Sequence, residues 1–508
     1  MTIDAGGSGV KAGVLCTRDW RVLAVAHREY RVSHPEPGHA EFDPGEWWAA
    51  MQEACAEAVA RAGAPPARYL AVTCTAMRIP FVLVDRSGTP VWPGVLNLDG
   101  RGRSYLDMVR DALGGQALYE LTGHWPAVPL GLPKLLWFKH RRPDVWARVA
   151  TVLQMHDWML YELCGEMASE PSSASMGQLL DIAHRRWATP LLEAVGIPTE
   201  LFPPLRDAGS YLGGLRPSVA RAMNLLAGTP VHVGGGDTHM GCLGAGGVEV
   251  GGVVIVGGST TPIQLTAASP VCHPVTRPWV SAHLFPGLWA AEMNVGATGI
   301  MYKWLRDLCA GLAPDGALPS YGHLDALAAR SPLGARDLLV TAANPHWSEA
   351  TWLRRSPTTL FDLTPAHSLG DLARATLESV CYAVRSNLEQ LETVHGGPFE
   401  RVLLVGGASH SPLWSQILAD VLGRVVRIPD VEEAAALAGG RIVLKDRRNE
   451  WGGPMPARDV CPDPGAHDAY RPYYQRYLEV HDGLGRVNWH ERDRRLKSPG
   501  RDGPAKAG

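Results

Sequence analysis

Short apolar runs separated by polar turns alternate with longer segments of helical periodicity along most of the chain. In the first hundred residues the apolar runs predict strands at residues 1–4, 10–16, 22–26, 71–73 and 81–84. Residues 44–62 predict a helix with Asp43 as its N-cap and Gly63 as its stop. Residues 135–164 are also helical in character, with a break near Pro143.

The second half repeats this alternation. Residues 231–233, 253–256 and 401–405 predict strands, whereas 369–391 and 411–423 predict helices. Strands mixed with helices in both halves predict an α/β protein with two lobes. We expect the first lobe over residues 1–245, the second over 246–450, and a C-terminal extension over 451–508 that ends in a flexible tail.

Several predicted strands end in glycine clusters that also carry a hydroxyl or a carboxylate. The first cluster runs from Asp4 to Lys11 and contains Gly6, Gly7 and Ser8. Glycines between two strands let backbone N–H groups approach an anion, Asp4 could hold hydrated Mg²⁺, and Lys11 could reach a phosphate. A tight hairpin with an exposed Asp and Lys is an equally good interpretation of this cluster alone. The pattern is neither a Walker loop nor a dinucleotide fingerprint.

The second cluster is Gly234-Gly235-Gly236-Asp237. A carboxylate at this position, facing the space between the lobes, could accept the proton of an attacking hydroxyl in phosphoryl transfer. Taken alone, a glycine turn with a capping Asp is more often structural.

Two further clusters, Gly257-Gly258-Ser259 and Gly406-Gly407-Ala408, follow strands of the second half. Each would be a simple turn in isolation. Their number and spacing match a duplicated nucleotide-binding fold with ATP in the cleft between two lobes, so phosphate binding is the favoured hypothesis.

Composition and charge exclude several classes of protein. The 508 residues include 48 basic and 51 acidic side chains, so the net charge of -3 offers no surface for nucleic acid. No apolar stretch approaches the ~20 residues that span a bilayer, which excludes a membrane protein. Nine scattered cysteines without a CxxC pair, and no secretory signal after Met1, favour reduced thiols and a cytoplasmic location.

The motifs together resemble the FGGY carbohydrate kinases, within the superfamily of actin, hexokinase and heat-shock ATPases. The resemblance extends almost end to end and rests on the glycine clusters above, on Glu433-Ala434-Ala435-Ala436-Leu437, and on residues 37–44 followed by Trp47-Trp48. Thr75-Ala76-Met77-Arg78, residues 157–161 and residues 236–244 are most similar to the autoinducer-2 kinases.

This resemblance implies a fold of two ribonuclease H-like, actin-like ATPase lobes with the active site between them. It implies transfer of the γ-phosphoryl group of ATP, with Mg²⁺, to a hydroxyl of a small sugar or polyol. Asp237 would be the general base, and Asp4 with Asp237 would hold the metal. Met77, Arg78 and Asp99 would face the substrate. The nucleotide would contact Gly6, Gly7, Ser8, Lys11, Gly257, Gly258, Ser259, Gly406, Gly407 and Ala408. The resemblance also allows a homodimer.

Two alternatives stay open at this stage. A pentulose kinase similar to xylulokinase is the near competitor of an enzyme that acts on open-chain autoinducer-2. Gly7 stands where the family usually has Thr, and Ala438-Gly439-Gly440 departs from the usual pattern. These departures leave room for a catalytically weak sugar or nucleotide sensor on the same fold.

Overall fold

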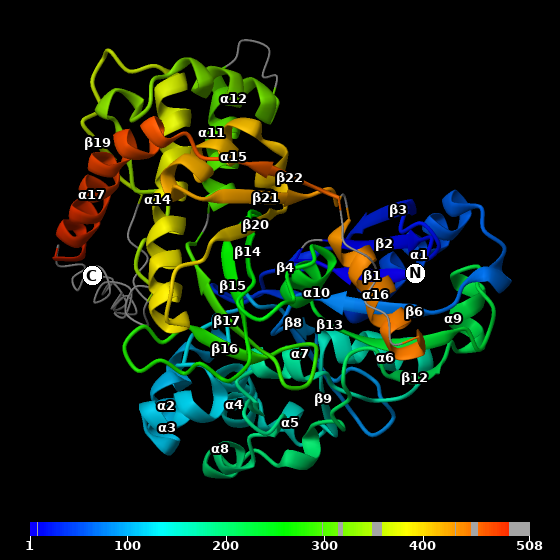
Figure 1. Ribbon diagram of the computed structural model, residues 1–508. Helices are drawn as coiled ribbons and strands as arrows, with labels where there is room; N and C mark the ends of the chain where they lie inside the picture. The colour runs from blue at the N-terminus through cyan, green and yellow to red at the C-terminus, as the bar shows by residue number, and fades with distance from the viewer. Residues whose placement is uncertain are drawn as a thin grey trace, which may run out of the picture.

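The computed structural model describes residues 1–7, 9–296, 298–312, 318–347, 358–431, 433–448 and 456–486. Figure 1 shows a mixed α/β molecule with two main sheets, one built from the first half of the chain and one from the second. Two sheet-based lobes agree with the fold class predicted from the sequence. None of the helices in these ranges combines the length and hydropathy that a bilayer span requires.

The N-terminal lobe is organised around a six-stranded sheet in the order β12-β13-β6-β1-β2-β3. The strands are β1 (Thr2–Ala5), β2 (Gly9–Leu15), β3 (Val22–Glu29), β6 (Val72–Ala76), β12 (Tyr211–Gly214) and β13 (Pro230–Gly236). β1 pairs antiparallel with β2 but parallel with β6, and β6 pairs parallel with β13. Parallel strands end at one edge of a sheet, so the residues after β1, β6 and β13 are brought together there.

The helices near this sheet are α1 (Pro44–Ala62), α6 (Met155–Cys164), α7 (Pro171–Met176), α9 (Pro217–Ala222) and α10 (Asp237–Gly244). The predicted ends of α1 are confirmed. Asp43 accepts a hydrogen bond from Glu46 N at 2.9 Å, and Gly63 adopts the left-handed conformation, φ 63°, that favours glycine.

A second, five-stranded sheet of the first half has the order β4-β5-β8-β7-β9. Its strands are β4 (Val32–Ser33), β5 (Glu41–Phe42), β7 (Phe81–Val84), β8 (Gly94–Val95) and β9 (Thr151–Gln154). Nearby lie α2 (Leu106–Leu113), α3 (Gly115–Thr122), α4 (Gly131–Arg141), α5 (Pro143–Trp146), α8 (Thr189–Ala194) and the hairpin of β10 (Leu180–Asp181) with β11 (Arg186–Trp187).

The helical interpretation of residues 135–164 is therefore partly wrong. The chain leaves the helical conformation after Trp146, and Thr151–Gln154 becomes strand β9, paired with β7. Val152 and Leu153 are buried in this pairing. A run of four residues between two helices is too short for periodicity to separate it from either.

The C-terminal lobe has a seven-stranded sheet in the order β16-β17-β15-β14-β20-β21-β22. Its strands are β14 (Val253–Val256), β15 (Pro262–Ala267), β16 (Trp279–Ala282), β17 (Trp289–Asn294), β20 (Arg401–Val405), β21 (Val425–Pro429) and β22 (Ala457–Val460), with β18 (Leu339–Val340) and β19 (Leu360–Phe361) as a separate pair. The helices are α11 (Thr298–Leu312), α12 (Tyr321–Arg330), α14 (Leu369–His395), α15 (Pro412–Leu422), α16 (Ala434–Arg448) and α17 (Pro464–Arg486).

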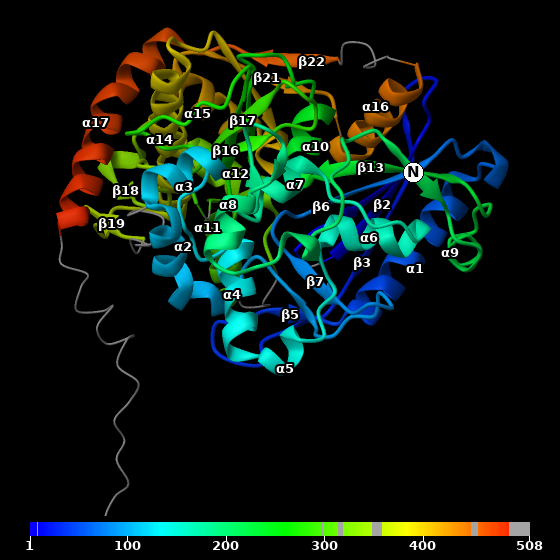
Figure 2. The same cartoon turned by 90° about the horizontal axis from the view of Figure 1, so that it is seen from below.

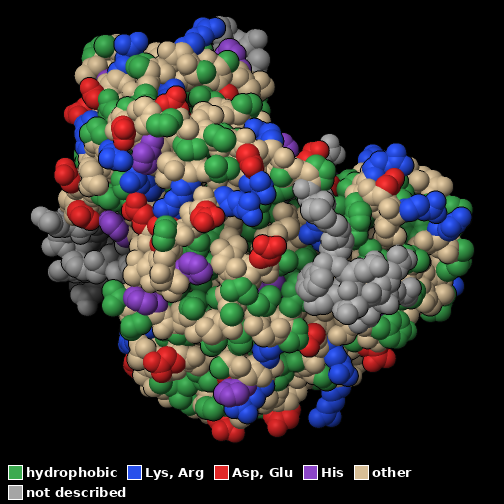
Figure 3. Space-filling model, viewed as in Figure 1, with side chains coloured by type: hydrophobic (Ala, Val, Ile, Leu, Met, Phe, Trp, Pro, Cys, Tyr) green, Lys and Arg blue, Asp and Glu red, His purple; other side chains and the backbone are tan. Residues whose placement is uncertain are grey.

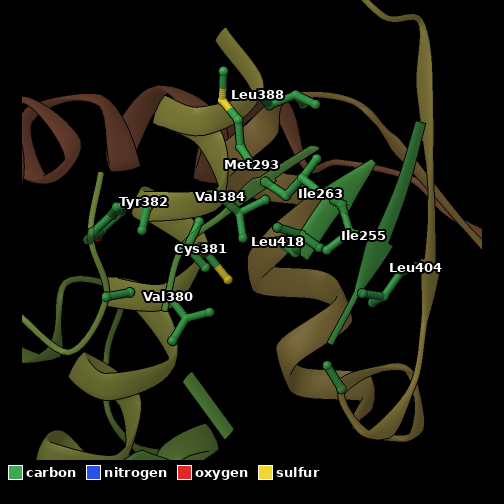
Figure 4. Close-up of a cluster of buried hydrophobic side chains, with 14 of the residues drawn as sticks. Ile255, Ile263, Met293, Val380, Cys381, Tyr382, Val384, Leu388, Leu404 and Leu418 are labelled. Atoms are coloured by element: carbon green, nitrogen blue, oxygen red, sulfur yellow. The ribbon is translucent and has the colours of Figure 1, made fainter. Parts of the chain in front are cut away.

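Helix α14 anchors the core of this lobe. A capping box of Ser368 and Asp371 starts it, and Gly396 ends it in the left-handed conformation. Figure 4 shows its side chains, including Val380, Cys381 and Val384, packed with Leu418 of α15 against the strands that carry Ile255, Ile263, Met293 and Leu404. This packing holds the ends of β14 and β20 at one edge.

Helix α16 belongs to the second half of the chain but packs on the first lobe. In Figures 1 and 2 it lies beside β1 and β2, next to α10. A Cβ at Gly244 would overlap the backbone of Ala434, and one at Gly439 would overlap Thr2. Glycine at positions 244 and 439 therefore lets α16 approach α10 and β1 closely, although these elements lie far apart in the sequence.

The predicted C-terminal extension is folded over residues 456–486. Strand β22 joins the edge of the seven-stranded sheet, and α17 buries Tyr470, Tyr474 and Tyr477 against the core. The predicted flexible tail lies outside the described residues. All nine cysteines are free thiols, as predicted.

Candidate active site

Asp237 lies where strand β13 passes into helix α10. Gly234, Gly235 and Gly236 belong to the strand rather than to a separate turn, which differs from the predicted loop. A Cβ at Gly234 would overlap the carbonyl oxygen of Cys74 on the neighbouring strand β6, so the close pairing here requires glycine. Thr75 Oγ1 on β6 also donates to the carbonyl oxygen of Gly235 at 2.8 Å. These contacts fix the backbone that presents Asp237.

The carboxylate of Asp237 faces Arg78. Its Oδ1 accepts a hydrogen bond from Thr238 N at 2.7 Å and lies 3.5 Å from Arg78 Nε. About two fifths of its side-chain surface, 41%, is accessible to solvent. Although part of the side chain is accessible, the surrounding protein desolvates the carboxylate and raises the pKa of Asp237 above its ordinary value, and the Arg78 guanidinium offsets part of this rise. An accessible, positioned carboxylate of this kind suits a proton acceptor.

Asp4 lies near Asp237, at the end of β1. It is opposite Lys11 on β2 and opposite Thr75 on β6. Burial raises the pKa of Asp4 to about 7, and the negative charge of Asp237 adds to the rise. The structure therefore brings together the two carboxylates predicted to hold a metal.

Two carboxylates that repel one another fit a divalent cation. Mg²⁺ is usually held by one or two carboxylates and completes its octahedral shell with water and phosphate oxygens. Within the described ranges no cluster of three or more His, Cys, Asp or Glu side chains could hold a metal. Asp4 and Asp237 could supply two carboxylate ligands to Mg²⁺, with phosphate oxygens and water as the others.

Lys11 is engaged by an ion pair. Its Nζ lies 3.0 Å from Oε2 and 3.3 Å from Oε1 of Glu433, directly before helix α16. The pair connects the first phosphate-type hairpin to the second half of the chain. A phosphate at Lys11 would share the ammonium group with Glu433.

The hairpin between β1 and β2 is formed as predicted. Gly6 N donates to Gly9 O at 2.9 Å, and Tyr30 Oη donates to Gly6 O at 2.9 Å. Gly7 is exposed, and a Cβ placed there would meet no atom within 4 Å. Ser8 lies outside the described residues. The hairpin therefore leaves room for the Thr that the family usually carries at position 7.

The two predicted nucleotide loops of the second lobe lie against each other. Ala408 N donates to Gly257 O at 3.0 Å, and Gly257 N donates to Val405 O at 2.8 Å. Ser259, Gly406 and Gly407 are exposed, while Gly257 and Ala408 are buried at the contact and Gly258 is half-buried. The exposed backbone N–H groups of Ser259, Gly406 and Gly407, after β14 and β20, are suited to donate to phosphate oxygens.

The contact between these loops predicts that a side chain at position 406 would be unfavourable. Its φ is 82°, and a Cβ there would lie 2.8 Å from Gly257 O. We expect Gly406→Ala to cost about 1–3 kcal/mol of unfolding free energy and to raise the KM for ATP. Urea unfolding and initial-rate kinetics would measure the two effects.

Gly407→Ala is the matched control, because its Cβ would meet Gly257 O only at 3.6 Å and its φ is not positive. Equal effects of the two substitutions would contradict the role assigned to Gly406.

A cavity of about 550 Å³ opens beside the second loop. It is lined by Ser409, His410, Ile428, Pro429, Asp430, Val431, Pro456, Ala457 and Arg458. Its volume is typical of a small-molecule site. A second cavity, of about 720 Å³, is lined by none of the predicted site residues and lies by Cys16, Tyr69 and Gly440.

Two of the predicted substrate residues are buried. Met77 is 6% exposed, and its N–H donates to Ala5 O at 2.8 Å. Asp99 is fully buried and accepts hydrogen bonds from Ala40 N, Arg101 N, Arg101 Nε and Arg101 Nη2 at 2.7–2.9 Å. Burial alone would raise the pKa of Asp99, but the bonds from Arg101 and Ala40 lower it. The Asp99 carboxylate is therefore engaged in this buried network and does not lie at an open surface that faces a ligand.

Lys134 is buried next to this network, and its burial predicts that the stability of the protein depends on pH. Its ammonium group donates to Leu96 O at 2.8 Å and Asn97 O at 3.2 Å, and burial lowers its pKa to about 7. An unfolded Lys keeps its proton to about pH 10.4, so between these values the unfolded state binds more protons. The contribution of Lys134 to the unfolding free energy therefore rises with pH over this window and is constant below it.

We expect the unfolding free energy of the wild type, minus that of Lys134→Met, to increase by at least about 1 kcal/mol between pH 7 and 10. Lys139→Met is the control, because Lys139 lies on the same helix, is half-buried, and also donates to two carbonyl oxygens. Parallel pH curves for wild type and Lys134→Met would contradict the prediction.

Sequence reasoning missed several residues around Asp237. Glu292 on β17 forms two hydrogen bonds with Arg78, at 2.8 and 3.1 Å. Buried Ser172 accepts from Gly236 N at 3.2 Å and donates to buried Glu170. Glu170 and Ser172 lie at the start of a six-residue helix with no sequence motif that would single them out. Glu292, Glu170 and Ser172 come close to the site only when the chain folds, so the sequence alone does not indicate them.

Comparison with known proteins agrees with this arrangement. The profile "FGGY family of carbohydrate kinases, N-terminal domain" matches residues 1–244, and the corresponding C-terminal domain matches residues 251–443. An autoinducer-2 kinase of Escherichia coli (strain ATCC 8739) is 32% identical over 98% of this chain and 97% of its own. One from Salmonella choleraesuis is 32% identical over 86% of this chain and 84% of its own.

Solved structures have the same two-domain, actin-like ATPase fold. The xylulose kinase of Rhodospirillum rubrum superposes with a TM-score of 0.84 at 28% identity and covers 95% of this chain and 98% of its own. Plasmodium falciparum glycerol kinase with ADP shares the fold, with a TM-score of 0.81 at 14% identity over 95% of this chain and 98% of its own. With both family domains matched in order over most of its length, the chain belongs to the FGGY family of carbohydrate kinases.

Proposed function

We propose that this carbohydrate kinase phosphorylates a hydroxyl of autoinducer-2 in its open-chain dihydroxypentanedione form, with ATP and Mg²⁺. The observation that carries phosphoryl transfer is the accessible carboxylate of Asp237 beside Asp4 and Arg78, in a chain whose glycine loops follow strands of both lobes. The choice of substrate is supported by the autoinducer-2 kinases at 32% identity over most of the chain.

Asp237 acts as the general base in this proposal. Its Oδ accepts the proton of the attacking hydroxyl, while Thr238 N and Arg78 hold the carboxylate in place. The hydroxyl oxygen then forms a bond to the γ-phosphorus as the bond to the leaving ADP oxygen breaks. The exposed backbone of the loops at Ser259 and Gly406 supports the phosphates.

Asp4 and Asp237 would hold Mg²⁺, which would offset the charge that develops on the phosphoryl oxygens. The chain itself supplies little cationic charge here, because Lys11 is paired with Glu433 and Arg78 with Glu292. Phosphate binding would therefore depend on loop N–H groups and the metal more than on basic side chains.

A coupled assay for ADP over a panel of substrates tests the proposal. We expect turnover of the linear autoinducer-2 precursor to exceed that of xylulose, glycerol and other C4 to C6 polyols. Good turnover of xylulose with none of the precursor would make the protein a pentulose kinase, in line with its 28% identity to the Rhodospirillum rubrum enzyme.

A weakly active sensor is the second candidate, favoured by one observation. Exposed Gly7 provides no hydroxyl at the position where the family usually has Thr. Robust turnover of any substrate in the panel would exclude this candidate.

A further inference from the structure

The guanidinium of Arg78 is held between carboxylates of both lobes. Nη1 donates to Glu292 Oε2 at 2.8 Å, Nη2 donates to Glu292 Oε1 at 3.1 Å, and Nε lies 3.5 Å from Asp237 Oδ1. Both Nη atoms of the guanidinium thus face Glu292, and Nε faces Asp237. A carboxylate of another molecule would have to displace Glu292 from the Nη pair or compete with Asp237 for the Nε side.

Glu292 is well fixed in the C-terminal sheet. It lies on β17 directly opposite Gln264 of β15 and Trp279 of β16, and its side chain is 5% exposed. Gln264 is in turn held by Cys242, whose Sγ donates to Gln264 Oε1 at 3.1 Å. A buried carboxylate set by strand register cannot easily turn away from Arg78 when a ligand enters.

The charges around the site are mainly negative. Asp4, Asp237, Glu292 and Glu433 face the two cations Arg78 and Lys11, and each cation already has a carboxylate partner within 3.0 Å. An uncharged polyhydroxy compound brings no further negative charge into such a site. A sugar acid brings another negative charge and finds no free cation among these residues.

We propose that Glu292 is a specificity-determining residue that acts through Arg78. By occupying the guanidinium it excludes linear polyhydroxy carboxylates and restricts the enzyme to uncharged sugars and polyols. The inference rests on the proposed function only in placing the substrate beside Asp237. On this proposal, Arg78 at a substrate position does not by itself make the enzyme a kinase of sugar acids.

Equilibrium binding of two matched ligands tests the proposal. D-Gluconate and D-glucitol have the same six-carbon chain and differ in the carboxylate. In isothermal titration calorimetry, we expect the wild type to bind glucitol more tightly than gluconate. In Glu292→Gln, which releases part of the guanidinium, gluconate affinity should increase by about 10- to 100-fold relative to glucitol.

Glu378→Gln is the matched control, because Glu378 is also buried, lies 2.7 Å from an Arg (Arg374), and is on helix α14 outside the site. It should leave the ratio of the two affinities unchanged, which separates a general loss of packing from a change in specificity. Thermal unfolding of each variant would establish that it is folded.

Unchanged gluconate binding in Glu292→Gln, including none in either protein, would overturn the proposal. If that variant does not fold, the wild type alone decides, because gluconate binding tighter than glucitol binding contradicts the exclusion, and weaker binding supports it. The proposed function fails separately: gained gluconate affinity without turnover of the autoinducer-2 precursor would leave this inference standing.

Discussion

Asp237→Asn is expected to lower kcat by about 10²- to 10⁴-fold, the usual contribution of a general base. The amide has nearly the shape of the carboxylate and can still accept a hydrogen bond from Thr238 N, so the backbone at the start of α10 should be retained. It cannot accept the proton of the attacking hydroxyl. Steady-state kinetics with substrate and ATP varied in turn would show a loss concentrated in kcat.

Asp144→Asn is a suitable control, because Asp144 is an exposed partner of Arg142 in the outer part of the first lobe. Its kcat should match that of the wild type. Full turnover by Asp237→Asn, with substrate still bound, would contradict the role of Asp237 as the base.

Arg101→Met is expected to destabilise the protein by about 3–5 kcal/mol, the cost of leaving buried charges without a partner. Arg101 is buried and holds two carboxylates, Asp99 at 2.8 Å and Glu41 at 2.6 Å. Methionine fills much of the volume but leaves both carboxylates without this cation. Urea unfolding of both proteins at neutral pH would measure the difference.

Arg110→Met provides the comparison, because Arg110 pairs with Asp107 and Asp111 at the surface with 44% of its side chain exposed. Such a pair contributes less than about 1 kcal/mol. The same experiment bears on Asp99. A large rise in substrate KM in Arg101→Met, without loss of stability, would indicate that Asp99 faces the substrate rather than a structural network.

Much of the fold could be predicted where local chemistry determines it. Asp43 and Gly63 define the ends of α1, and the short apolar runs at Val253–Val256 and Arg401–Val405 could be predicted as strands because each ends at a glycine cluster. Strand β9 could not be separated from the helices on either side. The burial of the tyrosines of helix α17 could not be predicted from the sequence, because α17 is polar on one face. Their burial follows from the packing of α17 against α14.

The site was predictable in part for a different reason. Glycine clusters after strands indicate which residues can meet a phosphate, and Asp4 and Asp237 do lie near each other. The pairs Arg78–Glu292 and Lys11–Glu433 join residues 214 and 422 positions apart. Nothing in the local sequence of Glu292 indicates that it pairs with Arg78 of the other lobe.

The distribution of charge gives the phosphates of ATP little cationic support from side chains at the site. Figure 3 shows acidic and basic side chains interspersed over the visible face. At the site itself the two cations are already paired with carboxylates. The phosphates would therefore be held mainly by loop backbone and Mg²⁺, and we expect activity to depend strongly on the metal.

The most direct measurement is detection of the phosphorylated product. The protein would be incubated with ATP, Mg²⁺ and the autoinducer-2 precursor, and the mixture analysed by phosphorus NMR and mass spectrometry. We predict a phosphomonoester of the precursor formed in equal amount to ADP, and its near absence with Asp237→Asn. ADP formed together with free phosphate and no phosphorylated precursor, or equal product from the Asp237→Asn protein, would contradict the account.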